Sequence, residues 1–447
     1  MYYENNNIYI SKDNSVLFDL NSLDIYQIDK NTLHIFENIY NGNSKSLVKD
    51  RNYTEIYNTF FNNRNVDHKC DVKNKITAVR INVSNMCNFR CNYCFANCGN
   101  YSKKDKLMSF EIAKQICDFI KNNLEDVTDV GFFGGEPILN YKVIKMICED
   151  MPDNINFNMI TNLSILNKDI INLIKKYNIS VTVSIDGDKE INDLNRITKD
   201  NKSTYDLVSK NIETLLNNNC QLKMIESTYT SHAYKKYSKG GIAELLSKKF
   251  KTKHILVADV DTSKDELKLP FNSVYSKENI SNSLEEVFEN IFNNKVLLTC
   301  VEAKPLIYFV TKDNSDYFCT PGISTLIFDE DGYIWPCQAF INKENFRMGN
   351  ILEKLDNNID FKIVQGKLLN LKKSKETKCK KCIAKYWCQA CLPTVLSNDT
   401  GDIKVNVKKE MCERNKELTK QTLDTLSHYV NSGNLDKLLE NITNLGA

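Results

Sequence analysis

Short apolar runs alternate with amphipathic stretches between residues 76 and 294 of this 447-residue chain. The apolar runs have the length and composition of buried strands, and they lie at 78–84, 129–133, 156–161, 180–186, 222–230 and 254–260. Helical periodicity fills the gaps, at 109–123, 141–150, 168–177, 204–218 and 233–250. Ser109, followed by Ala113 and Ile116, predicts an N-capped amphipathic helix. Repeated strand–helix units indicate a parallel sheet, so six units predict an α/β fold built as a partial (β/α)6 barrel.

The pattern differs on both sides of this region. Short strands with polar turns between them are predicted at 7–11, 15–20 and 23–29, and helices at 31–40 and 53–61. The polar stretch 62–74 is typical of a linker. After about residue 294 the regularity stops until a polar helix predicted at 412–430, and a segment with so many loops needs metal ligation to be stable. We therefore expect three domains, at 1–73, 76–297 and 298–447.

Composition narrows the class of protein. Apolar residues make up 42% of the chain, and the formal net charge of +2 gives no reason to expect a nucleic-acid partner. The first residues lack the features of a secretory signal, and no apolar run approaches the ~20 residues that span a bilayer. We therefore expect a cytoplasmic protein with no membrane partner. Its sixteen cysteines are clustered, which in a reducing compartment indicates metal binding or catalysis.

The first cysteine cluster directly follows the first strand of the alternating region. Its members, Cys87, Cys91 and Cys94, have the spacing Cys-x3-Cys-x2-Cys. Active sites of βα barrels lie on loops at the carboxyl ends of strands. Three thiolates on such a loop can hold three irons of a cubane and leave the fourth iron open to a small molecule. A three-cysteine zinc site or buried free thiols is the structural alternative.

This spacing, with the aromatic Tyr93 before the last cysteine, resembles the signature of the radical S-adenosylmethionine (SAM) superfamily, whose open iron binds SAM. Other marks of that superfamily follow at the ends of later strands, beginning with the Gly-Gly-Glu-Pro sequence at 134–137. The resemblance implies SAM contacts at Tyr93, Gly134, Gly135, Glu136, Pro137, Thr161, Asn162, Ser184, Asp186 and Arg196. Ser184 and Arg196 are the candidates for the methionine carboxylate, because a guanidinium fork suits a carboxylate.

A second group of cysteines lies near the C-terminus and resembles the SPASM extension of radical SAM enzymes, which binds two auxiliary [4Fe–4S] clusters. The resemblance implies an outer cluster held by Cys379, Cys382, Cys388 and Cys412. It implies an inner cluster held by Cys319, Cys337 and Cys391, with Cys300 as the candidate for a fourth ligand. The alternatives are an inner iron left open for a substrate thiolate and a four-cysteine zinc ribbon at 379–391. Three [4Fe–4S] clusters and SAM are therefore the expected cofactors.

Residues 1–73 resemble the RiPP recognition element in size and order of elements. Such winged-helix modules bind leader peptides by adding them to an exposed sheet edge, and an unrelated N-terminal extension is the alternative. The other cysteines receive structural interpretations: Cys117, Cys148 and Cys220 as small core residues, and Cys98 as a residue that does not bind iron. We also expect a structural role for His232.

The subclass is indicated by a few stretches. Anaerobic sulfatase-maturating enzymes are one group of radical SAM enzymes that this chain resembles. In that group an Asp base directly follows the cysteine of Gly-x4-Cys, whereas this chain has Gln338 there. The stretch CTPGISTLIFDEDGYIWPCQAF and the sequence ESTYTSH resemble thioether-forming peptide maturases of the sactipeptide and ranthipeptide type. That resemblance implies a 5′-deoxyadenosyl radical, hydrogen abstraction from a precursor peptide and a new bond from a Cys sulfur to carbon.

The expected partners are a precursor peptide with a leader sequence and a low-potential electron donor, flavodoxin or ferredoxin. The alternatives keep the radical chemistry and change the product, to a carbon–carbon crosslink, an epimer or formylglycine. A zinc-stabilised peptide-binding protein is the non-enzyme alternative.

Overall fold

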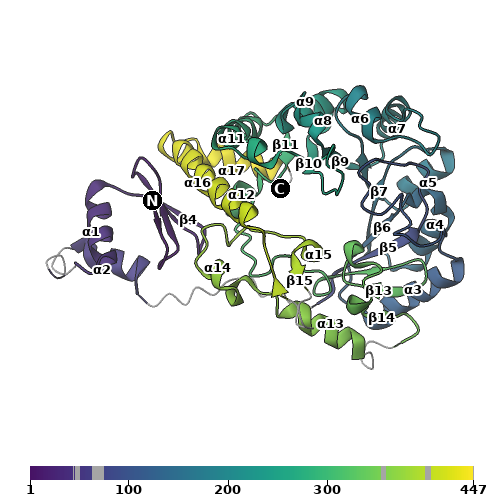
Figure 1. The fold of residues 1–447 in the computed structure, drawn as a ribbon, viewed down its shortest axis with the longest axis horizontal. Coiled ribbons are helices and arrows are strands. Elements are labelled where there is room, and N and C mark those ends of the chain that lie inside the picture. Colours follow the sequence, from purple (N-terminus) through teal and green to yellow (C-terminus); the bar gives the residue numbers. More distant parts are fainter. Residues whose placement is uncertain (44, 46–50, 63–74, 354–358, 398–403, 446–447) are drawn as a thin grey trace.

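The computed structural model describes residues 1–43, 45, 51–62, 75–353, 359–397 and 404–445. Figure 1 shows a small N-terminal unit on the left and a larger body that contains a long curved sheet on the right. All but the first residue of the predicted linker at 62–74 lies outside the described residues.

The N-terminal unit is an antiparallel sheet covered on one face by two helices. Its strands follow chain order, and they are β1 (Tyr2–Tyr3), β2 (Ile8–Ile10), β3 (Val16–Asp19) and β4 (Asp24–Gln27). The helices are α1 (Lys30–Tyr40) and α2 (Arg51–Phe60). Alternate strand residues face opposite sides, so Leu17 joins Ile35 and Phe36 in a small core under the helices. Phe18 points the other way, into the main core of the molecule.

The larger body is organised by one ten-stranded sheet in the order β11-β10-β9-β8-β7-β6-β5-β12-β13-β14. All six predicted strands are present, as β5 (Ala78–Ser84), β6 (Asp129–Gly134), β7 (Asn156–Thr161), β8 (Ser180–Ser184), β9 (Leu222–Tyr229) and β10 (His254–Asp259). These strands are parallel, as the strand–helix alternation predicted.

Strands that the pattern did not predict extend this sheet at both edges. The short β11 (Leu297–Thr299) adds to β10 in parallel. At the other edge β12 (Thr325–Phe328) pairs in parallel with β5, and β13 (Tyr333–Trp335) and β14 (Gly349–Asn350) follow antiparallel. The C-terminal part of the chain is therefore hydrogen-bonded directly to the first barrel strand.

The helices of this region cover one face of the sheet (Figure 1). They are α3 (Phe110–Asn123), α4 (Tyr141–Asp150), α5 (Lys168–Lys176), α6 (Lys189–Asn195), α7 (Tyr205–Asn217), α8 (Ser231–Tyr234), α9 (Lys239–Phe250), α10 (Phe271–Val274) and α11 (Lys277–Phe292). Ser109 caps α3 as predicted, since its Oγ accepts from the Ile112 amide at 3.2 Å. The single helix predicted at 233–250 is wrong: Ser238 starts a new helix by accepting from the Gly241 amide at 3.0 Å.

The C-terminal part has short elements joined by long loops and ends in two helices. Its helices are α12 (Lys304–Val310), η3 (Gln338–Phe340), η4 (Glu344–Phe346), α13 (Ile359–Leu369), η6 (Lys373–Lys375), α14 (Thr377–Lys380), α15 (Leu392–Val395), α16 (Lys409–Asn431) and α17 (Leu435–Asn444), and its remaining strands are β15 (Leu396–Ser397) and β16 (Lys404–Val405). A short helix, η2 (Pro137–Asn140), lies earlier, after β6. No helix in the described ranges combines the length and the apolarity needed to cross a membrane.

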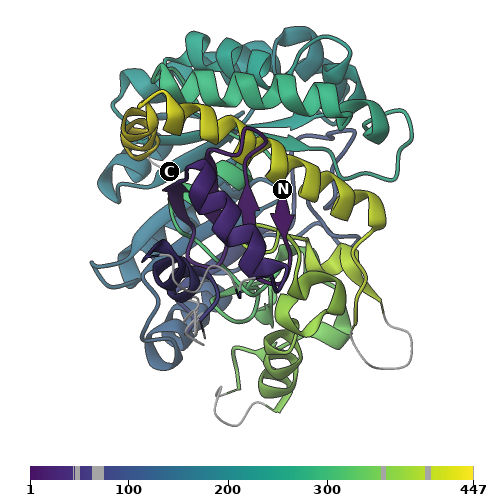
Figure 2. The same cartoon turned by 90° about the vertical axis from the view of Figure 1, so that its left-hand side faces the viewer.

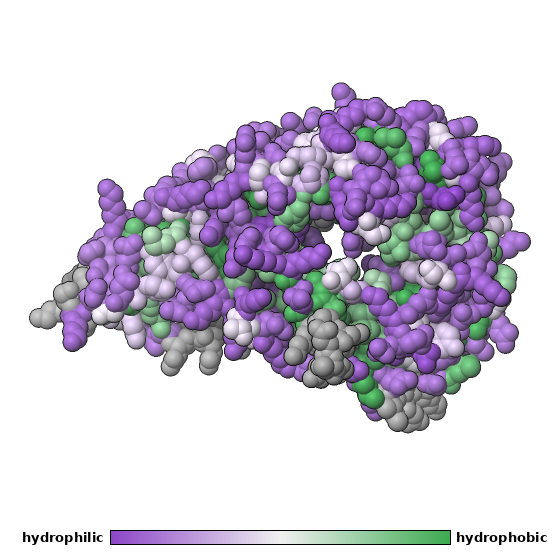
Figure 3. Space-filling model, in the orientation of Figure 1, coloured by the Kyte–Doolittle hydropathy of each residue, from purple (hydrophilic) through white to green (hydrophobic). Residues whose placement is uncertain are grey.

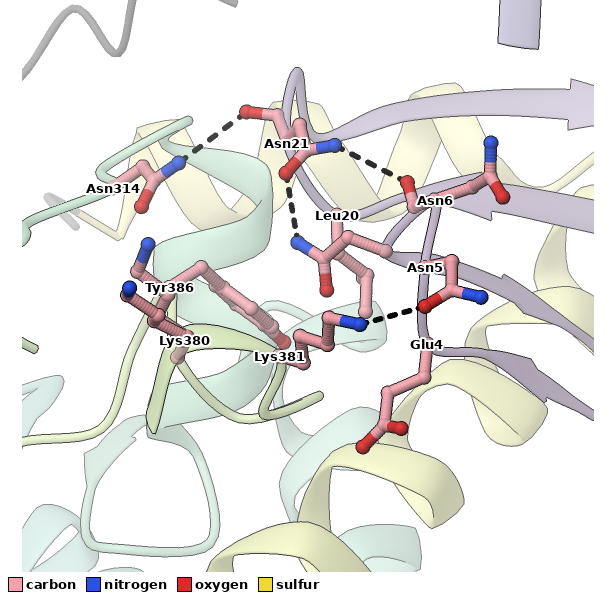
Figure 4. A pocket seen from close by; sticks show the side chains of 11 residues that line it. Glu4, Asn5, Asn6, Leu20, Asn21, Asn314, Lys380, Lys381 and Tyr386 are labelled. Carbon is pink, nitrogen blue, oxygen red and sulfur yellow. Dashed lines mark hydrogen bonds between the residues drawn. The ribbon is translucent and has the colours of Figure 1, made fainter. Parts of the chain in front are cut away.

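The N-terminal unit is packed against this C-terminal part, with α16 behind it in Figure 2. The Phe18 ring meets that of Phe309 on α12, with centroids 5.7 Å apart, and the Tyr9 hydroxyl donates to Asp424 on α16 at 3.0 Å. A polar pocket of about 220 Å³ lies at the junction (Figure 4). The Lys381 ammonium donates across it to the Asn5 amide oxygen at 2.7 Å.

Candidate functional site

The loop that carries Cys87, Cys91 and Cys94 leaves the carboxyl end of β5 and lines a cavity of about 660 Å³. All three cysteines are half-buried and point to the same cavity. Burial raises the pKa of the Cys87 thiol to about 12, with further contributions from Glu136 and from the Cys91 and Cys94 thiols. Burial likewise raises the pKa of the Cys91 thiol to about 11. Thiols gathered in this way stay protonated unless a cationic group binds them as thiolates.

Two glycines allow the next strand end to lie against this loop. A Cβ on Gly135 would come within 2.3 Å of the Met86 carbonyl oxygen, and one on Gly134 within 2.3 Å of the Ser84 oxygen. The Gly135 amide donates to Ser84 at 2.7 Å and the Glu136 amide to Met86 at 2.8 Å. Glycine is therefore needed at both positions, and the two glycines line the cavity beside the cysteines.

Glu136 lies behind the cavity wall and ties two strand ends together. Its side chain is 1% exposed, and its carboxylate accepts from the Thr161 hydroxyl at 2.6 Å, the Asn162 amide at 2.8 Å and the Ile138 amide at 3.1 Å. Burial raises the pKa of Glu136 in spite of these three donors. Pro137 follows it in η2, so this part of the sequence motif shapes the wall while Gly134, Gly135, Thr161 and Asn162 form its surface.

Tyr93, Asp186 and Arg196 form a buried hydrogen-bonded group at the cavity wall. The Tyr93 hydroxyl donates to Asp186 Oδ2 at 2.6 Å and accepts from Arg196 Nη1 at 2.9 Å. The second Asp186 oxygen accepts from the Thr228 amide at 2.9 Å. Burial raises the pKa of Tyr93 well above its ordinary value, so the hydroxyl keeps its proton at working pH. Tyr93, Arg196 and Ser184 line the cavity, whereas Asp186 is fully buried behind them.

The two groups of C-terminal cysteines occupy separate places. Burial raises the pKa of Cys337 to about 11, and the neighbouring Cys319 and Cys391 thiols raise it further. Burial raises the pKa of Cys379 to about 12, and the neighbouring Cys388, Cys382 and Cys412 thiols raise it further. The thiols of each set, 319/337/391 and 379/382/388/412, therefore act on one another, and their roles as iron ligands stay predictions. Cys300 is 3% exposed and has Glu302 and Lys239 as its charged neighbours instead.

Cys391 joins the inner group to the first site, because it lines the same cavity as Cys87, Cys91 and Cys94. Gln338, which follows Cys337, also lines it, and its Oε1 accepts from Arg80 at 3.3 Å. Figure 3 shows this face of the molecule hollowed between the sheet and the C-terminal segment. The cavity is therefore lined by the first cysteine group and by one member of the inner group.

The donor set fits iron–sulfur clusters. Among the described residues, no group of three or more histidine, cysteine, aspartate or glutamate side chains is placed to hold one metal ion. A cubane binds each thiolate to a different iron, so its ligands need not converge on one point. Asn415 Nδ2 lies 3.2 Å from Cys388 Sγ, a contact of the kind that tunes cluster potentials.

Several residues that line the cavity were not predicted from the sequence. Met224, Glu226 and Thr228 of β9 all line the cavity, and their period of two is visible in the sequence once the inward face of β9 is known. Burial raises the pKa of Glu226. At the end of β10, Asp259 lines the cavity and pairs with the buried Lys239 at 2.6 Å. That ammonium also lies 2.8 Å from Glu302.

The structure also places the other cysteines and His232, for which no ligand role was predicted. Cys117, Cys148 and Cys220 are core residues, as predicted, with exposures of 0%, 5% and 7%. Cys98 lines the same cavity as Cys87, Cys91 and Cys94. That it does not bind iron stays a prediction. His232 lies on α8 outside the cavity lining, with its Nδ1 buried and without a hydrogen-bond partner among the described residues.

Comparison with known proteins finds relatives of the barrel region. Residues 81–248 match the family described as the radical SAM superfamily. The radical SAM cyclopropyl synthase TigE of Paramaledivibacter caminithermalis is 30% identical over 34% of this chain and 35% of its own length. A cysteine-type anaerobic sulfatase-maturating enzyme of Clostridium novyi is 24% identical over 67% of this chain and 83% of its own length.

Two solved structures share the fold. AnSMEcpe with bound AdoMet has a TM-score of 0.65 at 19% identity, covering 80% of this chain and 99% of that one. Streptococcus suis SuiB bound to precursor peptide SuiA has a TM-score of 0.56 at 17% identity, covering 89% and 96%. The chain spans 44% and 35% of the first two curated relatives that it matches.

Proposed function

Because residues 81–248 form a radical SAM domain, we propose that the protein is a peptide maturase that uses SAM to form Cys thioether crosslinks in a ribosomally made precursor. The observation that carries the proposal is the shared cavity. Cys87, Cys91 and Cys94 line it from the barrel side, and Cys391 of the second cysteine group lines it from the C-terminal side. A peptide in that cavity would meet a radical source and a possible sulfur-binding site together.

The first site has the groups that SAM requires. Cys87, Cys91 and Cys94 would hold a [4Fe–4S] cluster with one open iron, and Gly134 and Gly135 let the backbone approach the ligand closely. The Arg196 guanidinium would bind the methionine carboxylate, since Tyr93 and Asp186 hold it at the cavity wall. SAM bound in this way would supply, on one-electron cleavage of its sulfonium C–S bond to methionine, a 5′-deoxyadenosyl radical able to abstract hydrogen from a peptide carbon.

The residues that line the cavity limit the competing reactions of a substrate radical. Phe95, Phe133, Met224 and Leu256 are among its apolar lining residues, and an apolar lining excludes water from a reactive carbon radical. Gln338 stands where a base would be needed for formylglycine formation, and an amide cannot accept that proton at working pH. These two features support a product in which the substrate sulfur is kept.

The C-terminal cysteines would supply the other half of the reaction. Cys319, Cys337 and Cys391 give an inner [4Fe–4S] cluster three thiolates, which leaves one iron for a substrate thiolate or for a further ligand. Cys379, Cys382, Cys388 and Cys412 give the outer cluster a complete set. The surplus electron of thioether formation would leave through these clusters, and flavodoxin or ferredoxin would supply the electron that starts the cycle.

The N-terminal unit would bind the leader of the precursor. Its sheet has two edge strands, β1 and β4, and an edge strand offers unpaired backbone groups to an added peptide strand. The Phe18–Phe309 contact and the Tyr9–Asp424 hydrogen bond fix the unit to the C-terminal part. The SuiB structure that shares the fold contains its precursor peptide SuiA, and this supports a peptide substrate here.

The test is anaerobic co-expression with a precursor peptide encoded beside the gene, followed by tandem mass spectrometry. A thioether loses two hydrogen atoms per link and leaves the linked cysteine resistant to alkylation. A carbon–carbon crosslink loses the same mass but leaves the thiol free, formylglycine loses the sulfur, and an epimer keeps its mass. Zinc in place of iron after anaerobic purification, with no cleavage of SAM, would instead support the peptide-binding protein.

A further inference from the structure

Lys373 is a buried lysine that the proposed reaction does not use. It begins η6, its side chain is 1% exposed, and its ammonium donates to the Lys385 carbonyl at 2.6 Å and to the Cys388 carbonyl at 3.1 Å. Both carbonyls belong to the segment that carries the outer cysteine group. The ammonium is therefore held at the back of that group, away from solvent.

This ammonium has no ion-pair partner among the described residues, because the neighbouring Asp316 carboxylate accepts from Ser374 instead. Carbonyl oxygens carry no net charge, and no carboxylate oxygen of the described residues forms an ion pair with Lys373. Another buried lysine among the described residues shows the contrast: Lys239 is 4% exposed and lies 2.6 Å from Asp259 and 2.8 Å from Glu302. A buried cation without a counter-ion is costly, so an anion is expected beside Lys373.

Two kinds of anionic group act on this ammonium: the Asp316 carboxylate, and the thiols of the outer cysteine group once they bind iron as thiolates. Burial lowers the pKa of Lys373 to about 8, and Cys388, then Asp316, then Cys379 act in the opposite direction. Four thiolates bound to an oxidised [4Fe–4S] core give a site with a net double negative charge. Such a site would give the ammonium a larger counter-charge than the single charge of Asp316.

We propose that Lys373 is the buried counter-cation of the outer [4Fe–4S] cluster, where its charge raises the reduction potential of that cluster. The inference rests on the proposed cluster at Cys379, Cys382, Cys388 and Cys412. Reduction adds one electron and makes the site more negative, so a nearby fixed positive charge stabilises the reduced form more than the oxidised form. The lysine thereby prepares the outer cluster to accept an electron.

Three substitutions in the full chain separate charge from packing. Lys373→Met removes the charge and both hydrogen bonds, and Lys373→Arg keeps a positive charge and its donors. Lys375→Met is the matched control, since Lys375 lies on the same turn but is exposed and bonds to Asn370. Each anaerobically purified variant is assayed for iron per chain and titrated with dithionite under EPR. The outer-cluster signal is identified by its loss in Cys382→Ser.

We expect Lys373→Met to shift the outer-cluster potential to a more negative value, with Lys373→Arg and Lys375→Met close to wild type. Loss of about four irons in Lys373→Met with full iron in Lys373→Arg would give the same support, because charge would then decide whether the cluster binds. An unchanged potential in Lys373→Met overturns the inference, and so does equal disturbance by Met and Arg. A wild-type protein without the outer cluster would overturn the proposed cluster itself, a distinct result.

Discussion

The hydroxyl of Tyr93 offers a sharp test of how the proposed SAM site is built. Tyr93→Phe removes one oxygen atom and leaves the ring in place beside the cavity. The lost oxygen donates to Asp186 at 2.6 Å and accepts from Arg196 at 2.9 Å. Arg196 is 8% exposed and Asp186 is 0% exposed, so water cannot readily replace the hydroxyl. The substitution therefore frees the guanidinium from the group that orients it.

The magnitude follows from the kind of bond that is lost. A hydrogen bond to a charged group contributes about 1.5–3 kcal/mol. If Arg196 binds the SAM carboxylate, the loss of its orientation weakens SAM binding by a comparable amount. Since 1.4 kcal/mol corresponds to a factor of ten in affinity, the dissociation constant of SAM should rise about ten- to a hundredfold.

Isothermal titration of SAM into anaerobically reconstituted protein measures this change. Tyr386→Phe is the matched control, because the Tyr386 hydroxyl is also buried and donates to the Pro305 carbonyl at 3.0 Å, and Tyr386 does not line the cavity. The control should lower the melting temperature and leave the SAM affinity unchanged. Equal SAM affinities in Tyr93→Phe and wild type would refute the orienting role of the hydroxyl.

Four further outcomes are expected. Replacing Cys87, Cys91 and Cys94 together by Ala should abolish formation of 5′-deoxyadenosine, measured by chromatography, and remove about four of about twelve irons; SAM cleavage that survives the triple substitution would refute the site. Lys239→Met should destabilise the protein by about 3–5 kcal/mol, because it leaves Asp259 and Glu302 buried without their cation, whereas the exposed Lys235→Met should leave the melting temperature unchanged. Burial opposes ionisation of Asp259, but the Lys239 ammonium outweighs this effect and lowers the pKa of that carboxyl. The stabilisation that the Asp259–Lys239 ion pair gives the folded protein is therefore complete above the ordinary aspartate pKa of about 3.9, and it is lost as the pH falls through the lowered pKa. A difference in melting temperature between wild type and Asp259→Asn that vanished already near pH 6 would contradict this. Phe18→Ala should cost about 3–5 kcal/mol at the contact with Phe309 and speed proteolytic release of the N-terminal unit, and unchanged proteolysis would show that this ring does not hold the unit in place.

Local signals in the sequence predicted much of the fold. Each barrel strand is a short apolar run in the sequence. Ser109 was predicted to cap a helix, and its Oγ accepts from the Ile112 amide as a cap does. The helix predicted at 233–250 failed because its apolar periodicity continues across Ser238, which caps a new helix instead. The strands β12 to β14 were missed because they are short, and β12 gains its stability by pairing with β5, more than 240 residues earlier.

The sequence by itself determined the spacing of the cysteines, their division into groups and the position of the first group at a strand end. These are properties of neighbouring residues, and local chemistry is enough to read them. Only the tertiary structure decided that Cys391 lines the same cavity as Cys87 and that Tyr93 joins Asp186 to Arg196. It alone decided that Lys373 is buried behind Cys388. The physical reason is that burial and facing depend on how distant segments pack, and no spacing along the chain records that.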